Sequence, residues 1–451
     1  MAREKKAGKE LTPEERLEQA LVPGEEQPYP VPENWCWVTI GAIASVKGGK
    51  RIPKGNKLVE YKTDHPYIRV TDFDNRSIAT EQVKYIDEET FKLIRNYTIS
   101  TQDVYISIAG TIGKVGIIPD DLDGANLTEN AAKITNIRGV EKNFLLWLLE
   151  SEVAQSQMRD ATISTTQPKL ALFRIENVKF PLSPLTEQQR IVSRIESLFA
   201  KLDEAKEKAQ AVVDSFELRK SAILHKAFTG ELTELWRKEN GRSDDDWRVA
   251  RFDEVAEIKS NLVNPADYQD FPHIAPDNVE KRTGVLLEYH TIAEDGVKSG
   301  KHLFHAGQIL YSKIRPNLSK VVIVGFDGLC SADMYPIDAK GNVRYLWYYM
   351  LSDEFLEQAS NAGSRSVLPK INQKELSKVM VRITSLEEQQ KIARILDDIF
   401  NKEQQAKETA EAALSQIDTM KKAILARAFR GELGTNDPAE EWAGELVIKM
   451  I

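Results

Sequence analysis

Residues Leu185–Leu232 read LTEQQRIVSRIESLFAKLDEAKEKAQAVVDSFELRKSAILHKAFTGEL, and residues Leu386–Leu433 read LEEQQKIARILDDIFNKEQQAKETAEAALSQIDTMKKAILARAFRGEL. The second stretch follows the first at a constant offset of 201 residues, and about 21 of the 48 aligned positions are identical. No gap is needed to align them, although the sequence between the two copies is different. A gapless repeat of this kind predicts two similar modules, each attached to a similar helix.

Both copies have the apolar spacing of a long helix, with apolar residues in alternating steps of four and three over about five heptads. Arg219 and Glu403 interrupt this seam. The residues predicted to form the helix interface are Ile191, Ile195, Leu198, Leu202, Phe216, Ile223, Phe228, Ile392, Leu396, Ile399, Ile417, Ile424 and Phe429. The seam also includes Ala205, Ala209, Ala406, Ala410, Ala413 and Met420. Pairing of the two copies within one chain is our interpretation, and a coiled coil between two chains is the alternative.

The connection after the first copy favours an antiparallel pair. If the helices were parallel, the segment from Gly230 to Trp247 would have to run back along the whole first helix, and its sequence is partly helical and so too short. We therefore predict an α+β fold of two β-rich globular modules separated by two long antiparallel α-helices. The helices would form an intramolecular coiled coil with pseudo-twofold symmetry.

The two modules begin alike, at Asn34–Val46 (NWCWVTIGAIASV) and Asp246–Ile258 (DWRVARFDEVAEI). Short runs of β-forming residues come next: HPYIRVTDF, QDVYISIA and KVGIIP in the first module, and GQILYSKI, SKVVIVGF and DMYPI in the second. An apolar helix is expected near the end of each module, beginning at Phe144 and at Tyr345.

Composition describes an ordinary multidomain protein of 451 residues, with 41% hydrophobic and 29% charged residues. No apolar run approaches 18 residues and the first residues are charged, so we expect neither a membrane span nor a signal peptide, and a cytoplasmic location. Two cysteines cannot form a disulfide framework. The net charge of −8 argues against a uniformly basic nucleic-acid binder but leaves room for local basic patches.

The sequence matches motifs of catalytic sites only weakly. Asn264-Pro265-Ala266-Asp267 departs at its third residue from the Asn-Pro-Pro-aromatic motif of amino-methyltransferases, and no phosphate-binding loop is present. His302 and His305 are expected to be a surface pair rather than metal ligands, because they lack companions at ligand spacing. Asp277, Asp338 and Lys340 match a nuclease triad only as scattered residues. We therefore expect no catalytic residue and no metal site.

Basic and amide side chains, which contact phosphates and base edges, are better represented. Lys47–Lys57 (KGGKRIPKGNK) and Ser312–Lys320 (SKIRPNLSK) are glycine- or amide-bearing basic loops, although a solvated turn is the alternative for the first. The predicted DNA-binding residues are Lys47, Lys50, Arg51, Lys54, Arg69, Lys114, Gln167, Lys169, Lys259, Asn261, Lys313, Arg315, Asn317, Lys320, Arg365 and Lys370.

The chain resembles the specificity subunit of type I restriction–modification enzymes from Asn34 almost to its end. The resemblance rests on PLTEQQRIV and SLEEQQKIA after the modules, on KSAILHKAFTGEL and KKAILARAFRGEL closing the helices, and on YIRVTDF, GTIGKVGI and TTQPKL within the first module. It implies a non-catalytic subunit in which each module reads one half of a split, asymmetric DNA target. The second module departs from the pattern, with SNLVNP in place of GGKRIP and IRPNLSKV in place of GTIGKV.

The resemblance also implies the partners. The helices would dock two modification subunits that carry S-adenosylmethionine and methylate adenine, and restriction subunits would add ATP- and magnesium-dependent translocation and cleavage, so this chain itself would bind no cofactor. The implied division is an N-terminal segment (1–30), target-recognition domain 1 (31–184), a central spacer helix (185–232), target-recognition domain 2 (233–385), a C-terminal spacer helix (386–433) and a tail (434–451). A non-catalytic scaffold with two β-rich binding modules is the alternative, and a nuclease or methyltransferase fused to its own reader is a third possibility.

Overall fold

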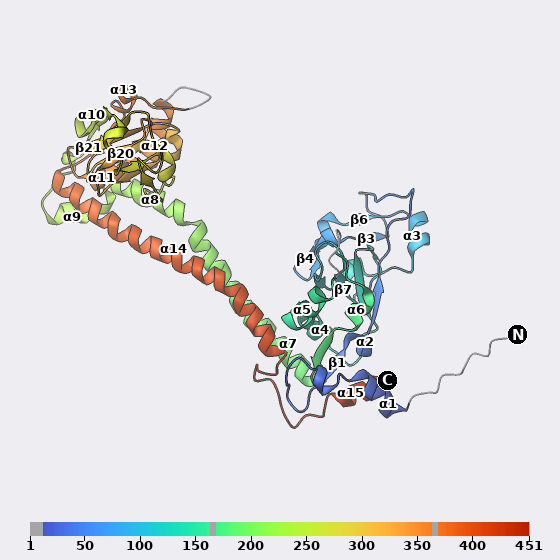
Figure 1. Cartoon of the computed structure of the whole chain (residues 1–451). Helices are drawn as coiled ribbons and strands as arrows, with labels where there is room; N and C mark the ends of the chain where they lie inside the picture. Colours follow the sequence, from blue (N-terminus) through green and yellow to red (C-terminus); the bar gives the residue numbers. More distant parts are fainter. Residues whose placement is uncertain (1–11, 163–167, 363–368, 451) are drawn as a thin grey trace. The chain divides into compact units, whose positions relative to one another are not determined.

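The computed structural model of the protein describes residues 12–162, 168–362 and 369–450 (Figure 1). The chain divides into two compact units, Met1–Glu207 with Ala413–Ile451, and Lys208–Ala412. Each unit contains one β-rich domain together with a segment of each long helix. Within the described ranges, no helix is both long and apolar enough to cross a membrane.

The first unit contains a domain of short strands covered by short helices. Its strands are β1 (Cys36–Thr39), β2 (Ser45–Gly48), β3 (Pro66–Ile68), β4 (Phe73–Asp74), β5 (Ser77–Ile78), β6 (Lys84–Tyr85), β7 (Val104–Ser107), β8 (Val115–Gly116), β9 (Asn126–Leu127), β10 (Ala131–Thr135) and β11 (Lys179–Leu182). Its helices are α1 (Pro13–Ala20), α2 (Ile40–Ile43), α3 (Glu88–Ile94), α4 (Lys142–Glu150), α5 (Glu152–Asp160), α6 (Leu172–Glu176) and α15 (Gly444–Met450).

The second unit contains a domain of the same kind. Its strands are β12 (Arg248–Arg251), β13 (Ala256–Ile258), β14 (Leu262–Val263), β15 (Pro272–Ile274), β16 (His290–Thr291), β17 (Lys301–Phe304), β18 (Ile309–Ser312), β19 (Val321–Ile323), β20 (Gly328–Cys330), β21 (Met334–Ala339) and β22 (Met380–Ile383). Its helices are α9 (Glu234–Glu239), α10 (Phe252–Val255), α11 (Val343–Met350), α12 (Asp353–Ala362) and α13 (Gln373–Leu376).

The repeat extends into the sheets. The central sheet has the order β2-β10-β7-β8 in the first domain and β13-β21-β18-β19 in the second, with antiparallel neighbours throughout. A two-stranded sheet, β1-β11 or β12-β22, joins the beginning of each domain to its end. All six runs predicted as strands contain one, because alternating β-branched and aromatic residues pack well on a pleated surface.

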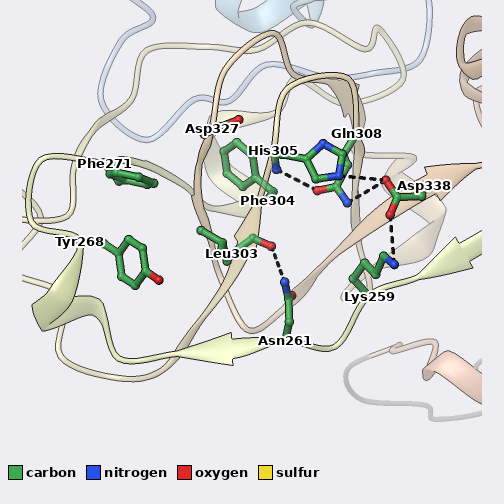
Figure 2. Close-up of a pocket in the computed structure, with 10 residues that line it drawn as sticks. All are labelled: Lys259, Asn261, Tyr268, Phe271, Leu303, Phe304, His305, Gln308, Asp327 and Asp338. Carbon is green, nitrogen blue, oxygen red and sulfur yellow. Dashed lines mark hydrogen bonds and ion pairs between the residues drawn. The ribbon is translucent and has the colours of Figure 1, made fainter.

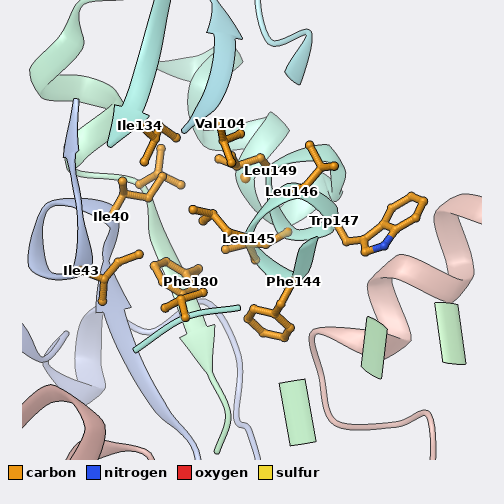
Figure 3. Packing of buried hydrophobic residues seen from close by; sticks show 14 of the residues in the cluster. Ile40, Ile43, Val104, Ile134, Phe144, Leu145, Leu146, Trp147, Leu149 and Phe180 are labelled. Atoms are coloured by element: carbon orange, nitrogen blue, oxygen red, sulfur yellow. The ribbon is translucent and has the colours of Figure 1, made fainter. Parts of the chain in front are cut away.

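The core of the first domain lies between this central sheet and α4. Figure 3 shows Leu145 and Leu149 of α4 facing Val104 and Ile134 on β7 and β10, and all four side chains are buried. At about 25 cal/mol per Å² of apolar surface, burying each of these side chains stabilises the fold by about 1.5–3 kcal/mol. In the second domain α11 has the same role, with Tyr345 and Tyr349 buried in the corresponding cluster.

The predicted single apolar helix at the end of each domain is two helices. The first is divided between α4 and α5 at Ser151, and the second between α11 and α12 at Leu351 and Ser352. Ser151 adopts an extended backbone (φ −69°, ψ 155°), and its hydroxyl donates to the Leu148 carbonyl. Ser352 makes the corresponding bond to Tyr349. These serines replace backbone helix bonds with side-chain ones, which ends the helix.

The long helices differ from each other. The second copy is one helix, α14 (Leu386–Ala428), whereas the first is divided into α7 (Leu185–Asp214) and α8 (Phe216–Phe228). The prediction of an uninterrupted first helix is therefore wrong at Ser215 (φ −85°, ψ −4°). The Ser215 hydroxyl donates to the Ala211 carbonyl, and Arg219 Nη2 donates to the Val212 carbonyl at 3.3 Å. Side-chain donors that compete for helix carbonyls bend a helix in this way.

Within each unit the beginning of one long helix packs beside the end of the other, so the pair is antiparallel and formed within one chain. In the first unit Ile191 and Ile195 of α7 share a buried cluster with Leu425 of α14. In the second unit Ile392 and Leu396 of α14 share a cluster with Leu224 of α8.

The end of each long helix also buries an aromatic ring against the domain that precedes the other long helix: α14 ends on the first domain and α8 on the second. Phe429 meets Phe144 of α4 with ring centroids 5.3 Å apart, and Phe228 meets Tyr345 of α11 at the same separation. Phe429 and Phe228, like Phe144 and Tyr345, are related by the repeat offset. These edge-on contacts hold each domain against the helix pair.

The heptad seam is only partly buried. Buried interface residues are Ile191, Ile195, Phe216, Phe228, Ile392, Leu396, Ile417 and Phe429, and half-buried ones are Leu198, Leu202, Ile223, Ile399 and Ile424. The prediction is wrong at Ala205, Ala406, Ala413 and Met420, which are exposed. Two helices without a third neighbour bury only a narrow strip, and small residues at its margin stay in contact with water.

The repeated Glu-Gln-Gln motif joins each helix to its domain. Glu187 and Glu388 are fully buried. Trp35 Nε1 donates to Glu187 at 2.7 Å, and Trp247 Nε1 donates to Glu388 at 3.3 Å. Each carboxylate also accepts a bond from the segment that comes after the other copy of the helix: from Asn436 Nδ2 at 3.0 Å for Glu187, and from Arg237 Nη1 at 2.7 Å for Glu388.

Candidate nucleic-acid interface

In each domain a β-bridge brings together two loops that are distant in sequence. Ala109, which comes after β7, bridges to Lys169, and Ile314, which comes after β18, bridges to Lys370. The bridged loops are β7–β8, which contains Lys114, and β18–β19, which contains Lys313, Arg315, Asn317 and Lys320. The two lysines of the bridges stand at equivalent positions of the repeat. Both domains therefore present cationic side chains at the same edge of the central sheet.

In the first domain a turn at residues 128–130 connects the basic loop Lys47–Lys57 to the β7–β8 loop. Lys50 N donates to the Leu127 carbonyl at 2.8 Å, and Arg51 Nε donates to Glu129 at 2.5 Å. On its other side, the Asn130 carbonyl accepts from the amide of Ile108 at 2.8 Å. The backbones approach so closely that a Cβ on Gly49 would lie 2.1 Å from the Thr128 carbonyl oxygen.

The side chains on this loop are exposed but not all are free. Lys47, Lys50 and Lys54 are exposed, and Lys50 Nζ lies 5.5 Å from the centre of the Tyr97 ring. The hydrogen bond to Glu129 raises the pKa of Arg51, whose side chain remains 78% exposed. An exposed ion pair of this kind is weakly held, so Arg51 can exchange Glu129 for a phosphate at low cost.

Arg69 is engaged elsewhere. Its guanidinium donates to Asp72 at 2.6 Å and to the Gln82 carbonyl at 2.9 Å. Asp72 is fully buried, so Arg69 neutralises a carboxylate inside the domain. Gln167 and Arg365 lie outside the described residues.

The second domain has a cavity of about 450 Å³ beside the β18–β19 loop. It is lined by Pro276, Asp277, Ser312, Ile314, Arg315, Leu318, Lys320, Asp333 and Lys370. Lys370 Nζ lies 3.0 Å from Asp333, and Lys320 Nζ donates to the Pro276 carbonyl at 2.6 Å. Burial and, to a smaller extent, the nearby charge of Lys370 lower the pKa of Lys313.

Lys259 and Asn261 belong to a different pocket of about 600 Å³ in the same domain (Figure 2). There Asp338 is the central acceptor: it accepts from Gln308 Nε2 at 2.9 Å and lies 3.3 Å from both Lys259 Nζ and His305 Nε2. The sequence-predicted binding residues of the second domain therefore form two groups.

The expectation of a surface histidine pair is wrong for His302. This residue is 3% exposed, and burial lowers its pKa. His305 is exposed and pairs with Asp338. Within residues 12–162, 168–362 and 369–450, no three His, Cys, Asp or Glu side chains are grouped to hold a metal ion.

Sequence reasoning missed the carboxylates among these cations. Glu129 pairs with Arg51, and Asp333 pairs with Lys370. The partners are 78 and 37 residues apart in sequence, so no local pattern connects them. These carboxylates reduce the positive charge that each domain presents.

The chain matches a family model described as the type I restriction modification DNA specificity domain, over residues 32–213 and 244–414. These two matches include both domains and most of both long helices. The chain belongs to the type I restriction–modification DNA specificity domain family.

Relatives of this specificity-domain family cover most of the chain. The chain is 37% identical over 322 residues to the type I restriction enzyme EcoDI specificity subunit of Escherichia coli, covering 67% of this chain and 72% of that protein. It is 21% identical over 433 residues to the EcoKI specificity subunit of Escherichia coli strain K12, covering 91% of each.

Solved structures share the fold of this specificity-domain protein. The HsdS subunit from Thermoanaerobacter tengcongensis superposes with a TM-score of 0.64 at 20% identity, covering 90% of this chain and 99% of that one. A chain from a study of complex assembly and conformational transition of the type I R-M system superposes with a TM-score of 0.65 at 20% identity, covering 90% and 100%. The repeated domain and antiparallel helix pair are thus features of a known fold.

Proposed function

We propose that this chain is the DNA-recognition subunit of a type I restriction–modification complex and reads a split, asymmetric target with one domain for each half. The target-recognition domains are residues 31–184 and 233–385, the spacer helices residues 185–232 and 386–433, and residues 1–30 and 434–451 flank them. The observation that carries the proposal is the pair of equivalent bridges, Ala109–Lys169 and Ile314–Lys370. They give two domains of one chain the same cationic edge with different side chains on it.

Different side chains on a common framework suit two different half-sites. The β7–β8 loop of the first domain has the sequence Gly110-Thr111-Ile112-Gly113-Lys114, and the corresponding loop of the second contains Arg315 and Asn317. Arginine and asparagine form bidentate bonds with guanine and adenine, respectively, in a major groove. Lysines around them supply phosphate contacts that position the protein without selecting a sequence.

Partners complete this function. Two modification subunits dock on the spacer helices and carry S-adenosylmethionine, while restriction subunits supply the ATP- and magnesium-dependent steps. This chain then contributes recognition and no catalytic group, and it acts in the cytoplasm, where the DNA is. Its first domain has about 19 basic and about 19 acidic residues over positions 31–184, so its long-range attraction for DNA is weak. Subunits that surround the duplex would supply the missing phosphate contacts.

The test compares DNA binding by the purified chain alone and with modification subunits, using duplexes with and without the sequence that the complex methylates in cells. We expect weak, unselective binding by the chain alone and selective binding by the complex. Selective binding by the complex only to its methylated sequence supports recognition by this chain. Equal binding of all duplexes in both samples would leave only a scaffold function.

A further inference from the structure

The two domains contain equivalent loops, residues 108–113 and 313–319, which differ by one residue in length and have different residues at their strained positions. In both, the backbone amide of the last strand residue before the loop bonds to the carbonyl of the lysine after it: Ser107 N to Lys114 O at 2.8 Å, and Ser312 N to Lys320 O at 3.0 Å. Between these residues each loop has two left-handed positions. In the first domain they are Gly110 (φ 74°) and Gly113 (φ 87°).

In the second domain the left-handed positions are Arg315 (φ 48°) and Ser319 (φ 45°). A Cβ disfavours this conformation, and glycine avoids the cost, as it does at Gly110. Arg315 also precedes Pro316, and a residue before proline strongly prefers extended backbone. The loop therefore holds an arginine where its sister loop has glycine, against the backbone preference of that arginine.

The surroundings keep this loop in place. Arg315 N donates to the Pro369 carbonyl at 2.8 Å, and the Ser319 hydroxyl donates to the Met350 carbonyl at 3.2 Å. Pro316 and Ser319 are both buried. Strain that persists because the surrounding structure enforces it is typical of functional positions.

The Arg315 side chain differs in its pairing from its basic neighbours. Lys370 lies 3.0 Å from Asp333, and Lys320 lies 3.7 Å from Asp277. Arg315 is exposed, and no described residue accepts a hydrogen bond from its guanidinium or forms an ion pair with it. It lines the 450 Å³ cavity, and within the described part of the chain its side-chain donors are available to a ligand.

We propose that Arg315 reads a guanine in the half of the target recognised by the second domain, through bidentate bonds from its guanidinium to O6 and N7. The lysines around it contact phosphates. A phosphate contact needs only a positive charge, which a residue on unstrained backbone could supply. Bidentate bonding to a base requires two parallel N–H donors held in one plane. The arginine guanidinium has them and the lysine ammonium does not. The inference rests on the proposed function and adds to it one residue and one base.

The experiment expresses the full chain with its modification subunits and maps methylated adenines across the genome of the host. The variants are Arg315→Gly, which installs the glycine of the sister loop, and Arg315→Lys, which keeps the charge and removes the fork. We expect that complexes with either variant no longer require a G·C pair at one position of one half-site. Their preference for G·C over other base pairs at that position should fall roughly 5- to 150-fold. The other half-site stays unchanged. Arg315→Gly keeps or raises the thermal midpoint of the chain, because it relieves the backbone.

Arg282→Gly is the matched control. Arg282 is also left-handed (φ 62°), and its amide donates to the Ser319 carbonyl at 3.2 Å, but its side chain lies 3.9 Å from Asp353. The complex that contains this variant should methylate the same DNA sequence as the wild-type complex. If the methylated DNA sequence is unchanged with Arg315→Gly, or if Arg315→Lys keeps the wild-type preference for G·C, the assignment of Arg315 is overturned. The proposed function then remains intact. Absence of any split methylated sequence with the wild-type chain overturns both.

Discussion

Arg219 and Glu403, the two residues that interrupt the heptad seam, pair with each other: Arg219 Nε donates to Glu403 Oε2 at 2.8 Å. At the corresponding repeat positions of the first unit stand Met420 and Leu202. The second unit therefore has an ion pair where the first has apolar residues. The same Arg219 donates to the Val212 carbonyl beside the break between α7 and α8.

We expect Glu403→Leu to destabilise the second unit by about 1 kcal/mol, because Arg219 is only 35% exposed and would lose its partner. The double variant Arg219→Met with Glu403→Leu, which installs the residues of the first unit, should recover most of this loss. Urea unfolding followed by circular dichroism measures both. Arg219→Met alone completes the comparison, and a double variant whose loss equals the sum of the two single losses would show that the pair is not coupled.

The two buried glutamates should respond differently to the same substitution. Glu388→Gln removes the buried carboxylate that pairs with Arg237, which is 6% exposed and whose other carboxylate partner, Asp244, is 86% exposed, so we expect a loss of about 2 kcal/mol. Glu187→Gln is the control: Trp35 and Asn436 donate to it as uncharged groups, so about 1 kcal/mol is expected. Thermal unfolding of the two variants gives the comparison, and equal losses would contradict a charge pairing at Glu388.

Stability should fall in mild acid because of His302. Burial lowers the pKa of His302 in the folded chain below its ordinary value of about 6.5. The unfolded chain therefore binds a proton that the folded chain does not, and stability is lost as the pH falls below about 6.5 towards the lowered folded pKa. The slope contributed by one such group is at most about 1.4 kcal/mol per pH unit.

Unfolding midpoints between pH 7.5 and 5.5 test this expectation. His302→Gln should flatten the dependence on pH. Parallel curves for the wild type and His302→Gln would refute a role for this ring.

The bridged lysines should contribute to affinity and not to sequence selection. Lys169→Ala is expected to weaken binding to all duplexes and to reduce the slope of log K against log salt by about 1. Lys370→Ala should reduce this slope by less, because Asp333, 3.0 Å from Lys370 Nζ, already offsets part of the lysine charge. Binding isotherms of the assembled complex at several salt concentrations measure both slopes. A changed methylated sequence with either variant would instead assign that lysine to base reading.

The sequence by itself determined the repeat and its direct structural consequences. The 201-residue offset, the β-forming runs and the apolar helical spacing predicted two similar β-rich domains and an antiparallel pair of long helices within one chain. The domains and helices could be predicted because they depend on local periodicity. The antiparallel direction could be predicted because the connection from Gly230 to Trp247 is short. The basic loops were also visible, because charge and glycine content are local.

Only the tertiary structure decided which residues meet. The Arg219–Glu403 pair spans 184 residues, and the Glu388–Arg237 pair spans 151. The seam prediction failed at Met420, Ala205, Ala406 and Ala413, because burial of a helix residue depends on how many neighbours surround the helix there. Left-handed backbone at Arg315 had no sequence signal either, since the surrounding loop rather than the residue itself enforces it. Contacts between distant segments depend on packing, which periodicity does not encode.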